Sequence, residues 1–249
     1  MTNELKAEFK KVFTIRSTYI ILGLMLILVI FFGFYVGGWH SQKLDLLDPY
    51  RLQTIAKQAI SFLSVFSAIL AVLLFTHEFR YNTISYTLTL SNSRQKVLLA
   101  KVITVGVIAL VATAVAGSLT PLLANWGIHA NHLHLVTQHF YYLDLLWRGL
   151  VFGLGYTMAG LVIAALIRNQ IGAIVALLLI PTTVEGLLSI WLKSNTVYLP
   201  FSALHTMLGA GTDIQKASLA PIDAMYVFLG YLAFSGAIAW YLFIKRDAN

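Results

Sequence analysis

Apolar residues occur along this chain in six long stretches, separated by shorter polar segments. Each stretch holds about 20 residues, enough for a helix that rises 1.5 Å per residue to cross roughly 30 Å of hydrocarbon. We place the spans at Thr18–Val36, Gln58–Thr76, Val102–Leu123, Leu145–Ile167, Ile171–Ile190 and Met225–Ile244. The pattern therefore predicts an all-α membrane protein in which residues 1–249 form a single transmembrane domain.

Composition agrees with a lipid environment. Hydrophobic residues make up 59% of the chain and charged residues 11%, whereas a soluble domain carries about 25% charged residues. Cysteine is absent, which excludes disulfides, thiol nucleophiles and thiolate metal sites. The net charge of +7 does not indicate nucleic-acid binding, because the cations gather at the ends of the apolar stretches. That placement is typical of membrane topology.

Lysine and arginine also predict the orientation of the spans. With the N-terminus in the cytoplasm, eleven of these residues lie inside: Lys6, Lys10, Lys11, Arg16, Arg80, Arg94, Lys96, Lys101, Arg168, Lys245 and Arg246. Six lie outside: Lys43, Arg51, Lys57, Arg148, Lys193 and Lys216. The segment between spans three and four, Ala124–Asp144, has neither residue type. We therefore predict that both termini are cytoplasmic.

Before the first span the spacing predicts an amphipathic helix that lies along the membrane surface. Four apolar residues recur at helical spacing and three lysines fall on other faces: Leu5, Phe9, Val12 and Phe13, with Lys6, Lys10 and Lys11. The lysines would then lie near anionic lipid headgroups. The alternative is an ordinary basic flank that only fixes the topology.

Three features concern the later spans and the outer side. Small residues from Gly149 to Ala164 share one face of span four, which indicates close helix packing within the subunit or between two subunits. The segment Trp191–Ala224 is too long for a simple turn, and Pro200 and Gly209 could begin and end a short re-entrant or external helix there. Glu185 lies near the outer end of span five, either as a gate residue or as an acid that reaches interfacial water.

The chain offers little for catalysis. It has no P-loop, because no glycine is followed by lysine. Four histidines of the external segment between spans three and four are weak candidates for a shared metal ion, because cysteine is absent and only one acid is nearby: His129, His132, His134 and His139. His139 and Asp144 match the His-x4-Asp spacing of glycerolipid acyltransferases, in which the acid orients a histidine base. A membrane enzyme with this pair is one alternative function, and an ATP-independent secondary transporter is another.

The segment between spans two and three is unusually long and basic. It reads HEFRYNTISYTLTLSNSRQKVLLAK, from His77 to Lys101. The alternation in Thr83–Leu90 is typical of a strand, but a lone strand would leave backbone groups unpaired at the interface. We therefore favour a short helix that puts Tyr81 and Ile84 on one face. The segment then forms a docking surface for a partner; the alternative is a basic loop that only enforces topology.

At this point the chain resembles the type-2 ABC-transporter permeases. The resemblance rests on EFRYNTI (Glu78–Ile84) followed by SRQKVLLAK (Ser93–Lys101). Asn82 replaces the glycine that is usual in the family, and Ser91 lies near the usual proline. The later stretches RNQIGAI, VEGLLS and YLPFSAL are also similar to small bacterial members, so the resemblance covers nearly the whole chain.

The resemblance implies one membrane subunit of an ATP-driven exporter in the bacterial cytoplasmic membrane. A second permease, most simply a second copy, and two copies of an ABC ATPase would complete it. The ATPase chains would hold ATP and magnesium, so no cofactor is expected here. The segment after span two would be the coupling helix, and its residues would transmit ATPase movement: Glu78, Arg80, Tyr81, Thr83, Ile84, Arg94 and Lys101. Arg80 and Arg94 would meet acids of the ATPase, Tyr81 and Ile84 would pack into its groove, and Glu78 would hold one of the arginines.

Overall fold

The computed structural model describes residues 2–41, 45–81, 83–84, 94–134, 136–209 and 219–245, and within these ranges it contains helices and connecting segments but no strand. The helices are α1 (Thr2–Val12), α2 (Arg16–Ile30), η1 (Phe31–Trp39), η2 (Asp45–Leu47), α3 (Arg51–Arg80), α5 (Arg94–Ala130), α6 (Tyr142–Ile167), α7 (Gln170–Leu179), η3 (Ile180–Val184), α8 (Glu185–Leu192), η4 (Lys193–Tyr198), α9 (Pro200–Leu208) and α10 (Pro221–Lys245). The predicted coupling helix, Thr83–Leu90, and the turn after it fall almost entirely outside the described residues.

Six helical stretches are long and apolar enough to cross a membrane, as the sequence predicts. They are Arg16–Trp39, Arg51–Arg80, Gln95–Ala130, Tyr142–Ile167, Gln170–Tyr198 and Pro221–Lys245. Five of the six extend beyond the predicted apolar stretch at both ends, and the fourth only at its start. A helix satisfies its backbone groups internally, so it can continue past the hydrocarbon into the polar interface.

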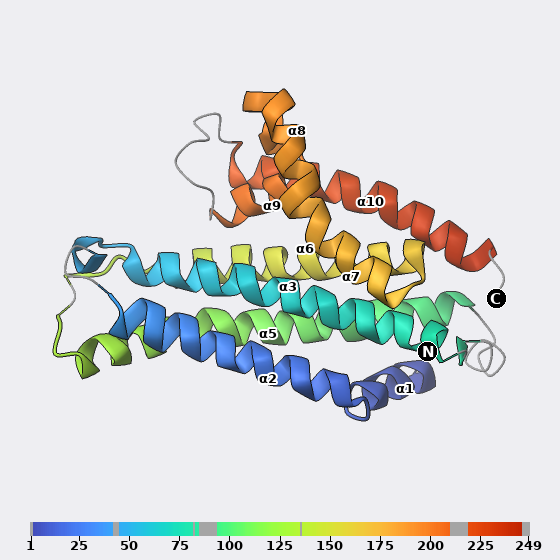
Figure 1. Ribbon diagram of the computed structural model, residues 1–249, viewed down its shortest axis with the longest axis horizontal. Helices are drawn as coiled ribbons and strands as arrows, with labels where there is room; N and C mark the ends of the chain where they lie inside the picture. The colour runs from blue at the N-terminus through green and yellow to red at the C-terminus, as the bar shows by residue number, and fades with distance from the viewer. Residues whose placement is uncertain are drawn as a thin grey trace.

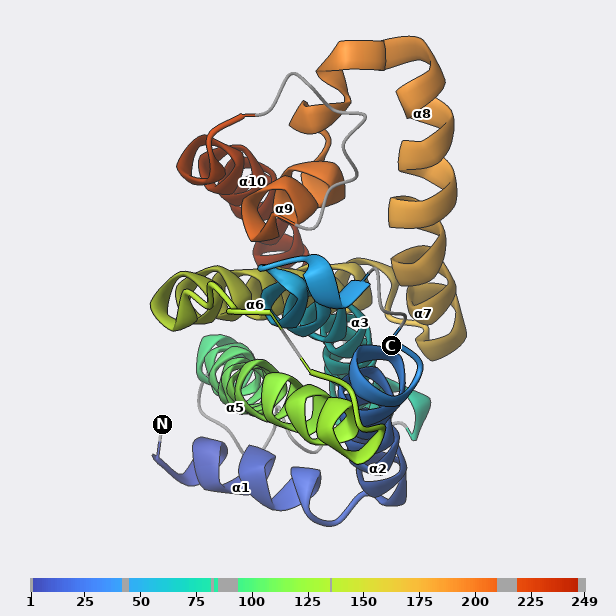
Figure 2. The same ribbon diagram turned by 90° about the vertical axis from the view of Figure 1, so that its left-hand side faces the viewer.

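The first four spans form a bundle of roughly parallel and antiparallel helices (Figure 1). Helix α1 crosses one end of this bundle and packs against α5, with most of its length transverse to the spans (Figures 1 and 2). The end of α10 lies at the same end of the molecule as α1 (Figure 1). The first described helix and the end of the last one therefore lie at the same end of the bundle, and the membrane side of the two termini stays a prediction.

Span four packs its small residues inside the subunit. A Cβ added at Gly160 would lie 2.9 Å from the carbonyl oxygen of Ala68. The hydroxyl of Thr157 donates a hydrogen bond of 2.9 Å to the Ser67 hydroxyl. Close backbone approach and a buried hydrogen bond are the usual means by which membrane helices associate. The interpretation of this face as packing within the subunit is confirmed.

The outer half of the first span is a π-helix, η1, that lies against α5. A Cβ added at Gly38 would lie 2.6 Å from the Cα atom of Gly127, so only glycine permits this contact. The guanidinium of Arg51 donates to the carbonyl of Val36 and to the Ser41 hydroxyl, at 3.4 Å each. These bonds fix the end of the first span to the start of the second.

Span five departs from the bundle. Its path runs through α7, the π-helical segment η3 that contains Pro181, and α8, and it diverges from the other spans (Figures 1 and 2). Proline removes a backbone donor and displaces the preceding turn, which explains the irregular helix here. Only 17% of the most apolar stretch of span five is buried, against 67% for span two. The short helix α9 packs against α6 and α10 and begins at Pro200, as the sequence predicts.

Candidate functional site

Four charged side chains meet at the end of the bundle where α3 stops and α5 begins. Glu8 and Lys11 come from α1, Glu78 from the last turn of α3, and Lys101 from the second turn of α5. We call them the four-charge cluster. Glu78 and Lys101 lie at the two ends of the long basic segment between spans two and three. Ion pairs of the cluster therefore bind both ends of that segment to the bundle.

The contacts within the cluster are direct. The ammonium of Lys101 lies 3.2 Å from Glu8 Oε1, 3.3 Å from Glu8 Oε2 and 3.2 Å from Glu78 Oε2. The ammonium of Lys11 lies 2.7 Å from Glu8 Oε1 and also donates to Glu78. Each lysine thus bridges both carboxylates. The two positive and two negative charges cancel, which lets the cluster exist away from water.

Three of the four groups are almost fully buried. Lys101 and Glu78 are each 2% exposed and Glu8 is 6% exposed. Isolated ions at such depth cost several kcal/mol each in lost hydration, and removing one partner of a buried ion pair costs about 3–5 kcal/mol. Burial is the largest single effect on Lys11 and lowers its pKa, but the carboxylates of Glu78 and Glu8 together outweigh it, so the pKa of Lys11 is raised. Lys11 is therefore charged at neutral pH.

Arg80 lies at the surface beside the cluster and faces the turn between spans four and five. Its guanidinium donates a 3.2 Å hydrogen bond to the side-chain oxygen of Gln170. Arg168 reaches across to the carbonyl of Leu242 at 3.1 Å. The two arginines line a pocket of about 340 Å³. Its other lining residues are Phe79, Asn169, Gln170 and Ile171. This arrangement suits an acidic side chain of another protein, because arginine binds carboxylates in a bidentate manner.

The remaining predicted coupling residues differ in accessibility. Tyr81 is 57% exposed and lies against the ring of His77, with Arg80 over its own ring. Thr83 is exposed, and its backbone amide donates to the carbonyl of Glu78 at 2.9 Å. Ile84 is only 3% exposed, so in this chain it packs inward rather than toward a partner. Arg94 begins α5, and its side chain lies outside the described part of the chain.

The structure gives Glu78 partners that the sequence analysis did not foresee. The sequence predicts that Glu78 holds Arg80 or Arg94, whereas in the structure its carboxylate pairs with Lys11 and Lys101. Lys11 was expected at the lipid headgroups, and it is instead part of the cluster. Glu8 was not singled out at all. One signal was present in the sequence: Glu8 precedes Val12 by one helical turn and therefore shares its inward face.

Glu185 holds two segments of the outer side together. Its carboxylate is 4% exposed and accepts hydrogen bonds from the backbone amides of Phe201 and Ser202, at 2.7 and 2.8 Å. It also accepts one of 2.7 Å from the Ser202 hydroxyl. These amides begin α9, where the helix dipole favours a negative charge. Glu185 therefore caps a helix that follows it by 16 residues, and a role in an outer gate stays a prediction.

The external histidines and the His139–Asp144 pair do not form a recognisable site. Within the described ranges, no three residues among His, Cys, Asp and Glu are grouped so that they could hold a metal. The ring of His139 lies 5.7 Å from that of Tyr50. Asp144 accepts hydrogen bonds from Arg148 at 2.7 Å and from the Trp147 indole at 3.2 Å. The acid is thus engaged by its own helix, which gives the acyltransferase alternative no support.

Comparison with known families gives the class of the protein. Residues 4–188 match the family model described as ABC-2 family transporter protein, and this is most of the chain. The chain belongs to the ABC-2 transporter family. Its six apolar helices and this membership make it a multi-pass membrane permease of an ABC transporter, and members of this family are membrane components that are not themselves catalytic. No curated protein matches the chain.

Proposed function

We propose that this permease works with a separate ATPase chain, which docks on the cytoplasmic segment after α3 and drives export of a substrate. The observation that carries the proposal is the four-charge cluster. It joins the last turn of α3, the second turn of α5 and the surface helix α1 through buried ion pairs. A force applied to the intervening segment would therefore reach three helices at once.

The coupling follows from this connection. ATP and magnesium would be bound by the ATPase, since this chain has no P-loop. Closure of two ATPase chains on ATP would displace the segment between Glu78 and Lys101. The cluster would pass the displacement to α3, α5 and α1 as one unit, because pulling one charge away from the others leaves buried charges unpaired. Tilting of these helices would open a path along the permease.

The contact surface for the ATPase would centre on Arg80. Its guanidinium and that of Arg168 line the same pocket, so an acid from the ATPase could reach both. Tyr81 and Thr83 are exposed beside it and would extend the contact. Arg94 at the start of α5 would add a further cation, while Ile84 would keep the segment packed on the permease.

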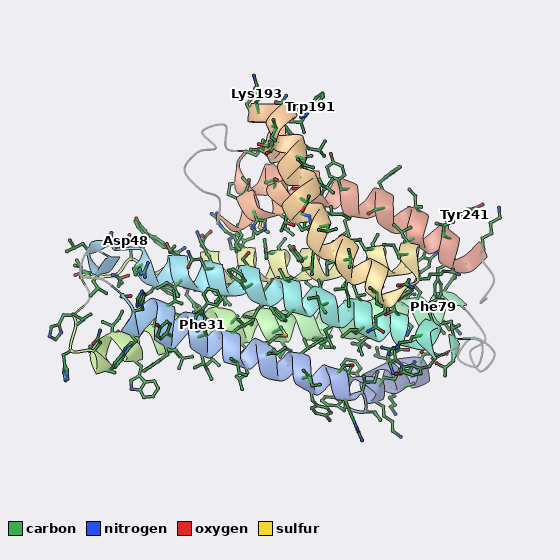
Figure 3. The ribbon with its side chains drawn as sticks, viewed as in Figure 1. Phe31, Asp48, Phe79, Trp191, Lys193 and Tyr241 are labelled. Carbon is green, nitrogen blue, oxygen red and sulfur yellow. The ribbon has the colours of Figure 1, made fainter. Side chains whose placement is uncertain are left out.

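A second permease would lie against span five. This span leaves the bundle, and its residues Leu187, Ile190 and Trp191 are 60%, 67% and 87% exposed. Trp191 and Lys193 lie at the tip of the diverging segment, far from the helices of spans one to three (Figure 3). Two copies of the chain would cover these apolar faces, enclose the path and recruit two ATPase chains. The assembly would reside in the bacterial cytoplasmic membrane with both termini in the cytoplasm.

Charge reversal tests the proposed docking surface. We expect the double variant Arg80→Glu and Arg94→Glu to insert normally but to lose the P-loop ATPase that co-purifies with the wild-type permease. Like charges placed opposite one another at an interface cost several kcal/mol, which weakens binding by about a hundredfold or more. The measurements are the amount of inserted permease, the amount of ATPase retained on it, and the ATP hydrolysis rate of the purified complex.

Lys245→Glu is the matched control, since it reverses a cation at the same end of the bundle on α10. It is expected to retain the ATPase. If the double variant inserts correctly and retains ATPase with an unchanged hydrolysis rate, the arginines are not docking residues. A basic segment that only enforces topology predicts a different result, namely reduced or inverted insertion with full ATPase retention in the correctly inserted fraction.

A further inference from the structure

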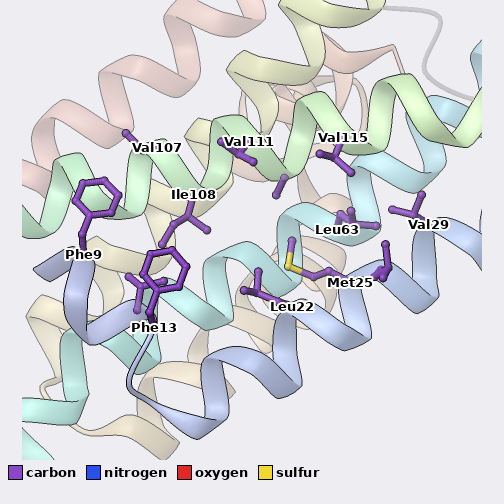
Figure 4. A pocket seen from close by; sticks show the side chains of 13 residues that line it. Phe9, Phe13, Leu22, Met25, Val29, Leu63, Val107, Ile108, Val111 and Val115 are labelled. Atoms are coloured by element: carbon purple, nitrogen blue, oxygen red, sulfur yellow. The ribbon is translucent and has the colours of Figure 1, made fainter.

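A groove lies on the lipid-facing side of the bundle, between the end of α1 and the paired helices α2 and α5. Its volume is about 350 Å³, and all of its lining residues are apolar. Figure 4 shows Phe9 and Phe13 at one end of the groove and Val29 and Val115 at the other, with Met25 between α2 and α3. An apolar cavity of about 150 Å³ stays free of water and binds benzene, so this larger one accommodates hydrocarbon.

The position of the groove matches one leaflet of the membrane. It extends along α5 from Val107 to Val115, which is about 12 Å at 1.5 Å per residue. On α2 it reaches from Leu22 to Val29, or about 9 to 20 Å beyond the start of the helix at Arg16. Half of the hydrocarbon core is about 15 Å thick. The groove therefore lies mainly in the leaflet against which α1 is packed.

Two cations stand at the end of the groove that α1 forms. Lys6 lies one helical turn before the groove residue Phe9 on α1 and Lys10 directly after it, so both lysines stand beside the apolar face of this helix rather than on it. Both lysines are exposed, and neither has an ion pair among the described residues. This distinguishes them from Lys11, which the four-charge cluster engages. Anionic headgroups attract cations at this height, by about 1 kcal/mol for each lysine near the surface.

The surroundings of the groove favour a single acyl chain over a second protein helix, because its lining offers no polar partner and the exposed charges beside it on α1 are cations that attract lipid headgroups. An acyl chain is thinner and already surrounds this face. Because lipid tails are as apolar as the lining residues, the hydrophobic effect gives little preference for one lipid over another. Selectivity must come from the headgroup.

We propose that this groove is a binding site for an anionic phospholipid of that leaflet, with one acyl chain between α1, α2 and α5 and the headgroup phosphate at Lys6 and Lys10. The site goes beyond the proposed transport function and does not depend on it, because neither the ATPase nor a substrate takes part. The bound lipid would hold α1 to the bundle in addition to the four-charge cluster.

A photoreactive lipid tests the site on the full chain reconstituted in vesicles. The probes are phosphatidylglycerol and phosphatidylcholine with the same diazirine-bearing acyl chain, each added in trace amounts to phosphatidylcholine vesicles. We expect labelled peptides from α2 and α5 around Met25 and Ile108, with about tenfold or more labelling by the anionic probe. Lys6→Gln with Lys10→Gln should bring the two probes close to equal labelling, whereas Lys245→Gln should keep the preference.

A second set of variants tests the groove itself by filling it. Val111→Trp adds a large side chain at a groove residue that is 58% exposed, so it occupies the space without disturbing the core. It should lower labelling of the α2 and α5 peptides several-fold with either probe, while Leu122→Trp, on a lipid-facing position of α5 that is 65% exposed, should not. Unchanged labelling in the Val111 variant, equal labelling of the wild type by both probes, or cross-linking of a cysteine at Val111 to a second copy would each overturn the proposal.

Discussion

At the scale of single residues, the four-charge cluster is the feature that decides the local chemistry. Its contribution is not simply favourable, because the attraction between buried ions is offset by the loss of their hydration. The cluster does not tolerate partial disruption, because the loss of any single lysine or carboxylate leaves a net charge buried among the remaining groups. A cluster of this kind forces α1, α3 and α5 to move as a group, which is the property that coupling requires.

Removing one cation from the cluster tests this intolerance. Lys101→Met keeps most of the side-chain volume but leaves Glu8 and Glu78 with a single lysine. We expect a loss of about 3–5 kcal/mol in stability, measured by circular dichroism during thermal unfolding in detergent. Lys96→Met, at an exposed position of the same helix, should change stability by less than about 0.5 kcal/mol.

The double variant Glu8→Gln with Lys101→Met provides the check on mechanism. It removes one negative charge together with the missing positive one, so the remaining Lys11–Glu78 pair is neutral. It should therefore recover part of the stability lost by Lys101→Met, as a non-additive pair in contact does. Additive losses, or a Lys101→Met protein as stable as the wild type, would show that the cluster does not act as a unit.

The sequence could indicate only half of this cluster. Glu78 and Lys101 lie at the two ends of the basic segment, and both belong to the stretches in which the chain resembles the permease family. Their partners are 67 and 93 positions away from them, and such long-range pairing depends on where α1 packs. The spacing of apolar residues predicts that α1 is amphipathic, but it does not specify which helix end its inward face meets.

At the scale of helices and their connections, Glu185 links α8 to the start of α9. Glu185→Gln keeps the shape of the side chain but removes its charge. The NH2 group that takes the place of one carboxylate oxygen is only a donor, so it cannot accept a hydrogen bond from Ser202. A buried donor left without its partner costs about 1–3 kcal/mol. We expect α9 to loosen locally, measured as faster hydrogen exchange of the Phe201–Leu208 amides with little change in α3.

Asp223→Asn is the control for this experiment, because Asp223 lies exposed in the first turn of α10. It changes an acid near the same region without touching α9, so exchange in Phe201–Leu208 should match that of the wild type. If Glu185→Gln also leaves this exchange unchanged, the carboxylate does not hold α9 in solution. An outer gate at this position would then have no structural basis.

Helix α5 joins the two sides of the membrane and therefore tests the topology. The chain has no cysteine, so single cysteines report their own positions. Gln95→Cys and His134→Cys are exposed sites at opposite ends of this helix. We expect an impermeant thiol reagent to label position 134 in intact cells and position 95 only after permeabilisation. The reverse pattern would contradict the predicted orientation, which puts eleven cations inside and six outside.

The helices themselves were the most predictable part of the fold. Six apolar stretches become six candidate spans because burial in lipid leaves a chain few alternatives to helix. The π-helical segments η1 and η3 were not predicted, since they depend on how the first span meets α5 and on how Pro181 is accommodated. Ile84 was expected at a partner surface, but helical spacing alone does not tell the side facing the partner from the side facing the chain's own core.

At the scale of the whole molecule, the bundle is asymmetric. Spans two and three are 67% and 50% buried in their most apolar stretches, whereas spans five and six are each 17% buried. Lipid can cover an apolar surface without cost, so exposure alone does not demand a partner. The divergence of span five is more informative, because a helix that leaves its neighbours gives up packing contacts that a second copy can restore.

Cross-linking along span five tests whether a second copy covers it. Closed two-fold pairing is the commonest symmetry of protein assemblies, and near a two-fold axis a residue meets its own counterpart. We expect Leu187→Cys, at a position that is 60% exposed on α8, to form a covalent dimer with a short bis-maleimide in native membranes. Leu122→Cys, 65% exposed on α5, is the matched control and should remain monomeric.

Cross-linking at both positions alike would indicate random collisions in the membrane. A functional complex whose measured mass accommodates only one permease would exclude pairing altogether, and the exposed face of span five would then belong to the lipid.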